Sequence, residues 1–342
     1  MRISQVMLAK GFGGAERHFV DLALELAARG HQVQVIHHRD FSAAAAFDGV
    51  VGLHAVPISV MGTWDILAAR RISRLIRLFG AALVHAHLAR AAHLSTHAVR
   101  ELAVPLVTNS HNYINLKYYR AVSAFVVPTA QQQAYLRGEG IADRQITLLP
   151  HFCRAPPTPS ASPRGGTLFA SLGRMVTKKG FDVLIKACGI LRAQGLDARL
   201  LLGGAGVELE PLRALARQCG VQQQVQFVGW VDCVAEFLHR ADVFVLPSRE
   251  EPFGIVLLEA MAASLPIVST RTDGAQQIFT DDSAYLVEID NAPALAAAMG
   301  AAITNRNESD RRAGNARVLY QALYSAEAVV PHYEALYKSL AP

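Results

Sequence analysis

The sequence predicts an α/β protein built from two doubly wound parallel-sheet domains. Strand-like apolar runs alternate with helical patterns along nearly the whole chain. A stretch rich in proline and without periodicity, residues 151–166, interrupts this alternation near the middle. With 342 residues and 51% hydrophobic content, each half is long enough to bury its own core. We therefore expect domains at 1–153 and 154–324, and a final helix at about 325–342 that packs back on the first domain.

The first half begins with the alternation in its clearest form. The apolar run at 2–8 predicts a strand, and the pattern at 14–30 predicts a helix that ends at Gly30. Further strands, with helical stretches among them, are expected at 31–38, 82–87, 105–111 and 124–129.

The second half restarts the same order after the proline-rich stretch. Strands are expected at 167–173, 198–204, 225–230, 241–248 and 266–270. Helices are expected at 180–195, at 207–220, from about Gly254 and at 325–340. Since parallel strands joined by helices end at one edge of the sheet, ligands are expected at that edge.

Cysteine spacing and hydropathy indicate a soluble protein of the cytoplasm. No apolar run approaches the roughly 20 residues that cross a bilayer. The cysteines are scattered, without the spacing of a disulfide framework or a zinc site. They are Cys153, Cys188, Cys219 and Cys233.

The net charge of +5 is unevenly distributed, because residues 1–155 carry +7 and the remainder carries −2. Much of the positive charge lies in the predicted amphipathic helix at 63–80. Its arginines are Arg70, Arg71, Arg74 and Arg77. A solvated helix face over the domain core is the favoured interpretation, and an anionic membrane surface is the alternative. The acidic second half argues against nucleic acid as a partner.

The stretch REEPFGIVLLEAMAASLP, residues 249–266, places Glu251 and Glu259 eight positions apart. If a helix begins near Gly254, Glu251 lies in the preceding loop and Glu259 about one turn into the helix. The unpaired amides of the helix start suit a phosphate, whereas the two carboxylates suit the hydroxyls of sugars on either side of it. The alternative is a loop acid favoured by the helix dipole, followed by a solvated helix acid.

Within that stretch, EPFGIVLLEAMA resembles nearly letter for letter the signature of the retaining glycosyltransferases of family 4. Those enzymes have the GT-B fold, in which two Rossmann-like domains face a cleft. The resemblance implies that Glu251 contacts the donor sugar and Glu259 the ribose hydroxyls. It also implies that the backbone of Phe253, Gly254 and Ile255 lies near the sugar and diphosphate. The second domain would then bind the nucleotide-sugar donor, and the first would lie on the acceptor side.

Other segments resemble the family in the expected order. SLGRMVTKKGFDVLIKA resembles the segment whose cations neutralise the diphosphate, here Arg174 and Lys179. QFVGW resembles the strand end near the nucleotide base and includes Trp230. AKGFGGAERHF resembles the first glycine-rich loop, in which Gly13 and Gly14 let the backbone approach donor phosphate and acceptor.

Histidine is concentrated in the first half, where 11 of the 13 lie at or before His151. The resemblance assigns His111 to sugar positioning or transition-state stabilisation, and the alternative is a loop histidine without a ligand. We expect His87 to line the cleft and His85 to pack inside. The family is generally metal-independent and the chain contains no D-x-D triplet, so neither a metal nor a cofactor is expected. The expected catalytic set is His111, Arg174, Lys179 and Glu251.

The implied reaction is retaining, front-face transfer of a sugar from a nucleotide-sugar donor, a UDP-sugar first and a GDP-sugar second. The basic half favours a cell-envelope acceptor such as lipopolysaccharide core or a lipid-linked oligosaccharide. The protein would then work in the cytoplasm, with a peripheral position on the inner face of the plasma membrane as a further expectation. A soluble acceptor and a sugar-nucleotide epimerase remain alternatives.

An NAD-dependent dehydrogenase is a remote alternative, because GFGGAE after a strand resembles a dinucleotide fingerprint followed by Asp40. Glu16, however, occupies the third glycine position, which needs a small residue. One departure from the family pattern is Ser264, which stands at the expected helix end where glycine is common and would have to adopt a left-handed cap.

Overall fold

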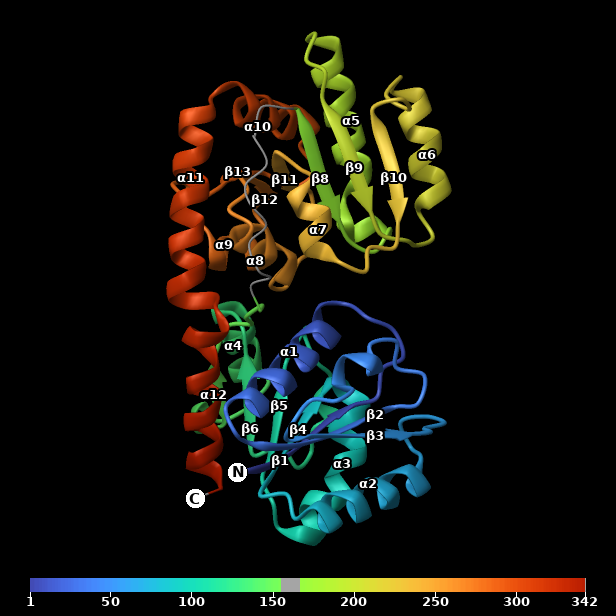
Figure 1. Ribbon diagram of the computed structural model, residues 1–342, viewed down its shortest axis with the longest axis vertical. Helices are drawn as coiled ribbons and strands as arrows, with labels where there is room; N and C mark the ends of the chain where they lie inside the picture. Colours follow the sequence, from blue (N-terminus) through green and yellow to red (C-terminus); the bar gives the residue numbers. More distant parts are fainter. Residues whose placement is uncertain (155–166, 342) are drawn as a thin grey trace. The chain divides into compact units, whose positions relative to one another are not determined.

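The structure is a computed structural model that describes residues 1–154 and 167–341. The chain divides into two compact units. Unit 1 comprises Met1–Arg154 together with Ala326–Pro342, and unit 2 comprises Ala155–Ser325. Each unit contains one parallel sheet, which confirms the predicted class of two Rossmann-like α/β domains (Figure 1).

Unit 1 has a seven-stranded sheet in the order β3-β2-β1-β4-β5-β6-β7. Its strands are β1 (Arg2–Met7), β2 (Gln32–His38), β3 (Leu53–Ile58), β4 (Leu83–His87), β5 (Leu106–Asn109), β6 (Ala124–Val127) and β7 (Ile146–Leu148). The central strands are buried along their whole length, as expected for a parallel sheet covered on both faces. Ile3 pairs with Val33 on one side and Leu83 on the other, so β1 is the strand at which the order reverses.

Helices cover both faces of this sheet. They are α1 (Gly14–Ala28), α2 (Ile66–Phe79), α3 (Leu88–Leu102), α4 (Ala130–Gly138) and α12 (Ala326–Leu340). One core cluster joins α1 and α12 to the sheet, and a second joins α2 and α3 to the opposite face. In α12 the buried residues Val329, Tyr333 and Tyr337 recur every four positions, so a single face of the helix packs on unit 1.

Unit 2 has a six-stranded sheet in the order β10-β9-β8-β11-β12-β13. Its strands are β8 (Leu168–Leu172), β9 (Arg199–Gly203), β10 (Val225–Gly229), β11 (Val243–Leu246), β12 (Ile267–Thr270) and β13 (Tyr285–Val287). Counted from β8, this is the order 3-2-1-4-5-6 of dinucleotide-binding sheets, and the order reverses between β8 and β11.

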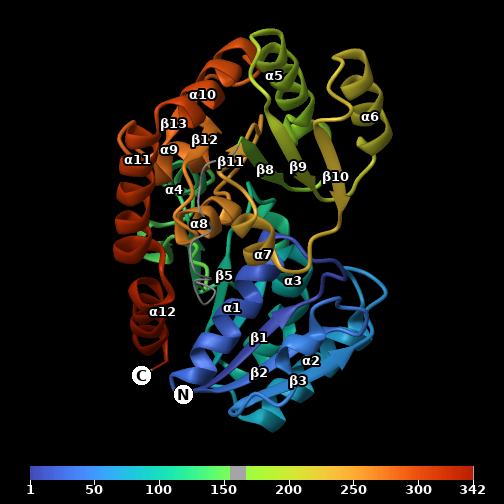
Figure 2. The same cartoon turned by 45° about the horizontal axis from the view of Figure 1, so that its top comes forward.

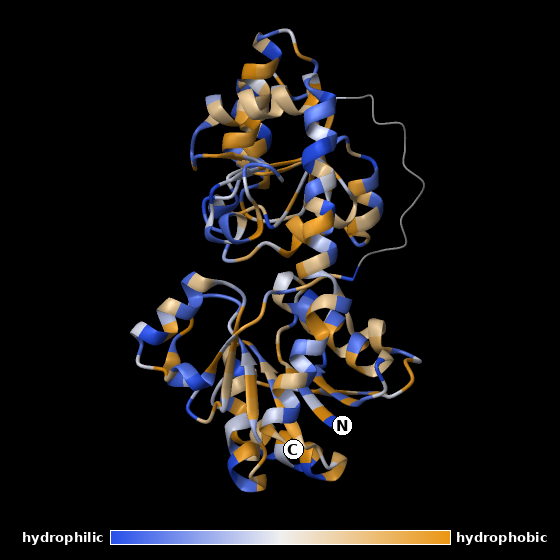
Figure 3. Cartoon of the chain, turned by 90° about the vertical axis from the view of Figure 1, so that its left-hand side faces the viewer, coloured by the Kyte–Doolittle hydropathy of each residue, from blue (hydrophilic) through white to orange (hydrophobic). Residues whose placement is uncertain are grey.

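The helices of unit 2 also lie on both faces of its sheet (Figure 2). They are α5 (Phe181–Ala193), α6 (Leu209–Gln218), α7 (Val234–His239), α8 (Ile255–Ala262), α9 (Asp273–Ile278), α10 (Ala292–Thr304) and α11 (Arg306–Leu319). Figure 3 shows α11 largely in hydrophilic blue, in agreement with its run of charged residues and its few buried positions.

The first residues of the predicted linker at 151–166 pack inside unit 1. Residues 155–166 lie outside the described residues. His151, Phe152 and Cys153, which the prediction assigned to the linker, are instead buried in unit 1. Phe152 joins the core cluster beneath α1 and α12, because a large apolar ring is more stable there than in water.

Candidate active site

The candidate site of unit 2 lies at the carboxyl ends of β8 and β11, where the strand order reverses. The loop after β8 carries Arg174 and Lys179, and the loop after β11 carries Glu251. The fold therefore brings together cationic and acidic residues that lie more than 70 positions apart in the sequence.

These two loops are in direct contact. Gly180 adopts a left-handed φ of 66°, and a Cβ there would lie 2.0 Å from the carbonyl oxygen of Pro247. The backbone N–H of Arg249 donates to the carbonyl oxygen of Lys178 at 2.8 Å. Position 180 must therefore be glycine, because any side chain would separate the two loops.

Lys179 and Glu251 form an ion pair across this contact, in which Nζ donates to Oε2. Their side chains are only 15% and 12% exposed. Partial burial weakens solvent screening, so this pair interacts more strongly than a surface pair. The two predicted residues thus lie together as a single paired group.

Helix α8 begins just beyond Glu251. Gly254 is its N-cap, with a φ of 89° that only glycine adopts without strain. The amides of Gly254, Ile255 and Val256 have no hydrogen-bond acceptor among the described residues. Such amides, together with the helix dipole, favour an anion.

Glu259 lies one turn into α8 and is half-buried. Phe253, in contrast, is 3% exposed, and its ring packs against that of Tyr324 inside unit 2. The N–H of Gly274 donates to the carbonyl oxygen of Glu251 at 2.9 Å, and a Cβ on Gly274 would lie 2.1 Å from the carbonyl oxygen of Phe253. The start of α9 therefore supports the loop that carries Glu251.

The other two predicted residues of unit 2 are exposed. The side chain of Arg174 has no hydrogen-bond or ion-pair partner within residues 1–154 and 167–341. It is therefore a cation available to an anionic ligand. Trp230 follows β10 and is 54% exposed. Ser264 adopts the left-handed conformation, with φ of 53°, that its position at the end of α8 predicted.

In unit 1 the glycine-rich loop leads into α1. Gly13 is the N-cap, and Gly14 is the first residue of the helix and is exposed. His111 follows β5 and is 9% exposed, with its ring stacked on that of His151 at 4.9 Å between centroids.

His111 belongs to a buried group of five histidines. The ring of His18 lies 4.5 Å from that of His151, and those of His85 and His87 lie 4.4 Å apart. His87 Nδ1 lies 3.4 Å from His111 Nε2. We call this group, His18, His85, His87, His111 and His151, the histidine cluster.

The histidine cluster is electrically neutral. Burial lowers the pKa of His85 and of His151 to about 3. Burial, followed by repulsion from neighbouring histidines, lowers the pKa of His18, His87 and His111 well below the ordinary value. These rings can donate or accept hydrogen bonds but supply no charge.

Helix α12 is tied to this cluster by hydrogen bonds. The hydroxyl of Tyr337 lies 2.6 Å from His85 Nδ1, and that of Tyr333 lies 3.1 Å from His18 Nε2. Asn109 donates to the Tyr333 hydroxyl at 2.8 Å, and its Oδ1 lies 2.6 Å from His85 Nε2. The C-terminal helix therefore completes the polar core of unit 1.

The expectation that His87 lines a cleft is wrong. His87 is 0% exposed, like His85, because the ring of Phe19 packs edge-on against it and His85 stacks on its other side. A histidine at the end of a parallel strand can equally well be covered by the helices on the sheet face.

Some residues around the site were not predicted from the sequence. Arg249 contacts three other segments around the Lys179–Glu251 pair, although its position inside the motif was visible. The roles of Asn109, Tyr333 and Tyr337 could not be predicted from nearby residues, because their hydrogen-bond partners lie up to 252 positions away in the sequence.

A basic and aromatic surface surrounds the start of α2. Met61, Trp64, Ile66 and Leu67 are between 68% and 90% exposed. The Trp64 ring lies 4.4 Å from that of His93 and 6.4 Å from that of Tyr118. Of the four arginines predicted there, Arg77 is ion-paired with Glu101, whereas Arg70, Arg71 and Arg74 are exposed.

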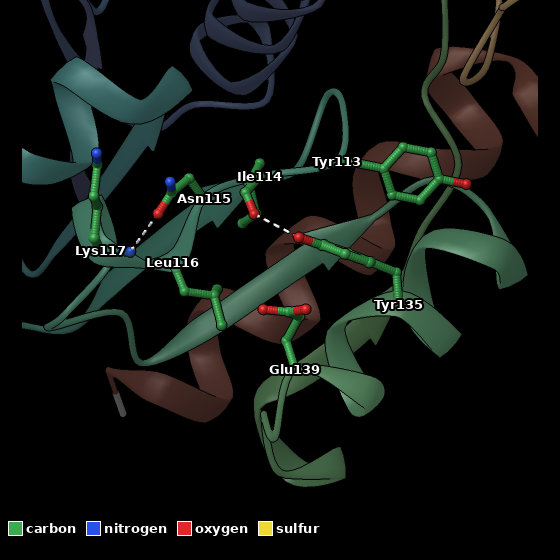
Figure 4. Close-up of a pocket in the computed structure, with 7 residues that line it drawn as sticks. All are labelled: Tyr113, Ile114, Asn115, Leu116, Lys117, Tyr135 and Glu139. Carbon is green, nitrogen blue, oxygen red and sulfur yellow. Dashed lines mark hydrogen bonds between the residues drawn. The ribbon is translucent and has the colours of Figure 1, made fainter.

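An open pocket of about 430 Å³ lies in unit 1 beside this surface, between the loop after β5 and α4. Figure 4 shows Leu116 and Glu139 pointing toward one another across it. The hydroxyl of Tyr135 donates to the carbonyl oxygen of Ile114 at 2.8 Å and fixes one wall. Its polar groups, including those of Lys117 and Glu139, suit hydroxyl-bearing ligands.

Among the described residues, no three histidine, cysteine, aspartate or glutamate side chains are grouped as metal ligands would be. None of the described helices combines the length and apolar character that crossing a bilayer requires.

The chain resembles known proteins along nearly its whole length. Residues 12–155 match the family described as Glycosyltransferase Family 4, and residues 157–318 match Glycosyl transferases group 1. The lipopolysaccharide core biosynthesis glycosyltransferase LpsE of Rhizobium meliloti is 28% identical over an aligned length of 342 positions, gaps included, that covers 96% of each chain.

Solved structures show the same fold. A glycosyltransferase from Rickettsia africae matches with a TM-score of 0.85 and 20% identity over 99% of this chain and 98% of its own. Anabaena HepE in complex with UDP-glucose matches with a TM-score of 0.85 and 18% identity over 99% of this chain and 100% of its own. The chain therefore belongs to the family 4, group 1 glycosyltransferases and has the GT-B fold.

Proposed function

We propose that this glycosyltransferase moves a sugar from a nucleotide-sugar donor to a hydroxyl of a cell-envelope glycan. A UDP-sugar is the first expected donor and a GDP-sugar the second. The acceptor would be a lipopolysaccharide core or a lipid-linked oligosaccharide. Two similarities support this choice, because LpsE is named for lipopolysaccharide core biosynthesis and HepE binds UDP-glucose.

The observation that carries the proposal is the arrangement around the Lys179–Glu251 pair in unit 2. Arg174, Lys179 and the amides of α8 suit a diphosphate, since each supplies positive charge or N–H donors. Glu251 and Glu259 supply acceptors for sugar and ribose hydroxyls. Lys179 has three N–H donors, so it can bind a phosphate oxygen while it still contacts Glu251.

The proposed reaction is a front-face substitution at the anomeric carbon. The bond from that carbon to the phosphate oxygen breaks, a bond to the acceptor oxygen forms on the same face, and the acceptor's proton passes to the departing phosphate. Negative charge grows on the diphosphate as the bond breaks. Arg174, Lys179 and the α8 amides would stabilise that charge, so the chain needs no metal for this step.

A donor screen followed by a transfer assay tests the proposal. Thermal unfolding of the protein would be measured with UDP-, GDP-, ADP- and dTDP-sugars, because a ligand that binds the folded state raises the melting temperature. The best donor is then incubated with lipopolysaccharide core oligosaccharide, with and without EDTA, and the anomeric configuration of the product is determined by NMR. We expect EDTA-resistant transfer with retention. Inversion would contradict the retaining mechanism, and loss of transfer in EDTA would contradict metal independence. The absence of donor binding would contradict the use of a nucleotide-sugar donor.

The exposed surface at the start of α2 supports a peripheral position on the inner face of the plasma membrane. Trp64, Ile66 and Leu67 would enter the headgroup region, and Arg70 and Arg74 would contact anionic lipids. Each such arginine contributes about 1 kcal/mol to binding.

Sedimentation with vesicles that contain anionic lipid tests this position. Reversing both charges, Arg70→Glu with Arg74→Glu, should lower binding by at least about tenfold. Arg213→Glu in unit 2 is the control, since Arg213 is also exposed but lies outside this surface. Equal binding of all variants would exclude the membrane contact.

A further inference from the structure

Arg249 is the most extensively bonded charged residue beside the proposed donor site. It lies in the loop after β11, two residues before Glu251. Its Nη1 donates to the carbonyl oxygen of Thr177 at 2.6 Å and to Asp182 Oδ1 at 2.8 Å. Its Nη2 donates to Asp182 Oδ2 at 2.9 Å, and its Nε donates to Asp290 Oδ1 at 2.6 Å.

These bonds join four separate segments of unit 2. Thr177 belongs to the loop that carries Lys179, and Asp182 is in the first turn of α5. Asp290 lies between β13 and α10 and has a left-handed φ of 60°. One planar guanidinium therefore holds the loop after β8, the loop after β11, a helix start and a turn in a fixed arrangement.

Arg249 itself is poorly suited to bind the donor. Four of its five N–H groups are already engaged by protein oxygens. Its charge is balanced by Asp182 and Asp290, at 2.8 Å and 2.6 Å. Arg174, in contrast, is exposed, and Lys179 has one acidic partner, so these two cations remain the ones suited to phosphate.

The Asp182 partner is ionised in this arrangement. Burial acts to raise the pKa of Asp182, but the hydrogen bonds and charges of Arg249 and, to a smaller extent, of Lys186 together outweigh it and hold that pKa below its ordinary value. The same bonds raise the pKa of Arg249. A bidentate arginine–carboxylate pair has a fixed orientation, which a lysine cannot reproduce.

We propose that Arg249 is a positioning residue for sugar transfer: it fixes the loops that carry Lys179 and Glu251, so that the pair meets the donor in one geometry. This inference rests on the proposed function. Backbone bonds alone fix the contact less well, because Arg249 and Glu250 donate only to the carbonyl oxygen of Lys178. A displacement of about 1 Å in such a pair is enough to reduce turnover by about a hundredfold.

The test is Arg249→Lys, which keeps the positive charge and removes the bidentate geometry. We expect kcat to fall by about 10- to 100-fold while the donor KM changes by less than about threefold. The matched control is Arg312→Lys. Arg312 is similarly buried in the same unit, bonded to Glu308 at 2.7 Å and to the carbonyl oxygen of Ala284 at 2.7 Å, but it lies on α11. Both variants lose stability, and only Arg249→Lys should lose turnover.

A double variant separates positioning from a direct role. If Arg249 acts through Lys179, Arg249→Lys in the Lys179→Ala background should lower kcat by no more than about threefold further. Multiplied losses would overturn the proposal, and so would an Arg249→Lys enzyme with wild-type kcat. Asp182→Asn, which keeps the size of the partner, serves if Arg249→Lys does not fold, and its kcat should also fall.

Hydrogen exchange provides a readout independent of the substrate. The amides of 177–182 and 249–254 should exchange faster in Arg249→Lys and not in Arg312→Lys. Unchanged exchange in these segments would overturn the inference even if the wild-type enzyme transfers sugar. A wild-type protein that neither binds nor uses any nucleotide sugar would instead overturn the proposed function and, with it, this inference.

Discussion

The two units have the same strand order around their first strand, but they differ in the side chains at the point where that order reverses: those of unit 1 are neutral, and those of unit 2 are charged. In unit 1, between β1 and β4, the space is filled by the neutral histidine cluster. In unit 2, between β8 and β11, it holds the Lys179–Glu251 and Arg249–Asp182 ion pairs. The topology thus fixes where a site can form, and the residues decide whether it suits a charged ligand.

Burial explains the difference. The histidines lose their charge because their rings are covered on all sides, and helix α12 supplies two of the covering hydroxyls. In unit 2, by contrast, the side chains form ion pairs in which each cation has a carboxylate within hydrogen-bond distance. A diphosphate needs such charges, whereas a neutral sugar or alcohol does not.

The largest expected effect is a loss of unit 1 stability in acid. The histidines have a folded-state pKa below the unfolded value of about 6.5, so their contribution is complete above pH 6.5 and is lost as the pH falls below it. As the pH falls from 7 to 5.5, each histidine should lower the free energy of unfolding by about 1 kcal/mol, and the whole cluster by about 5 kcal/mol. Hydrogen exchange resolved by segment should show β4 and β5 losing protection while β8 and β11 keep theirs. Equal losses of protection in both sheets would contradict the predicted difference between the two units.

The second prediction concerns Lys179→Ala. This change removes a cation from the growing charge of the diphosphate, so kcat should fall by about 10²- to 10³-fold. Steady-state kinetics with saturating donor measure it. Lys178→Ala is the control, because Lys178 is adjacent and enters the loop contact only through its backbone carbonyl oxygen. If the Lys179→Ala enzyme is as active as the Lys178→Ala enzyme, the Lys179–Glu251 pair has no role in the mechanism.

The third prediction concerns Glu259→Ala, which should weaken donor binding with a smaller change in turnover. Loss of the hydrogen bonds that ribose hydroxyls donate to a carboxylate costs about 1.5–3 kcal/mol, or roughly 10- to 100-fold in Kd. Calorimetric titration with UDP measures the loss, and Glu250→Ala, at an exposed position of the preceding loop, is the control. Unchanged UDP affinity would place the ribose elsewhere.

The smallest effect is expected for Tyr337→Phe. The change removes the hydroxyl that lies 2.6 Å from His85 Nδ1 and leaves a buried polar atom unsatisfied. We expect unit 1 to lose about 1–3 kcal/mol in urea unfolding. Tyr118→Phe, whose hydroxyl has no hydrogen-bond partner among the described residues, should cost under about 0.5 kcal/mol. If both variants are equally stable, the hydrogen bond between α12 and the histidine cluster does not stabilise unit 1.

Most of the fold was predictable, and the missed strands share one property. β3, β7 and β13 are the edge strands of their sheets. Their burial is partial, and β7 and β13 have only three residues each, so they give a weaker strand pattern than the buried central strands. The position of Ser264 was predictable because a helix end imposes a local backbone conformation.

The candidate site was predictable only where its functional residues lie close together in one segment of the sequence. Glu251, Gly254 and Glu259 belong to a single loop and helix start, so their spacing indicated their arrangement. The pairing of Lys179 with Glu251 was not predictable, because no local pattern specifies which side chains meet across two loops. The burial of His87 was missed for the same reason.

The amino-acid sequence by itself determined the alternation of strands and helices, the helix start at Gly254 and the family, because these depend on residues close together in the chain. Tertiary structure alone decided which residues are charged, neutral or paired. Arg249 acquires its partners from three other segments, and the histidine cluster is buried among side chains from several elements, α12 included. Hydrogen bonding and desolvation depend on neighbours in space, which the packing of the complete unit brings together.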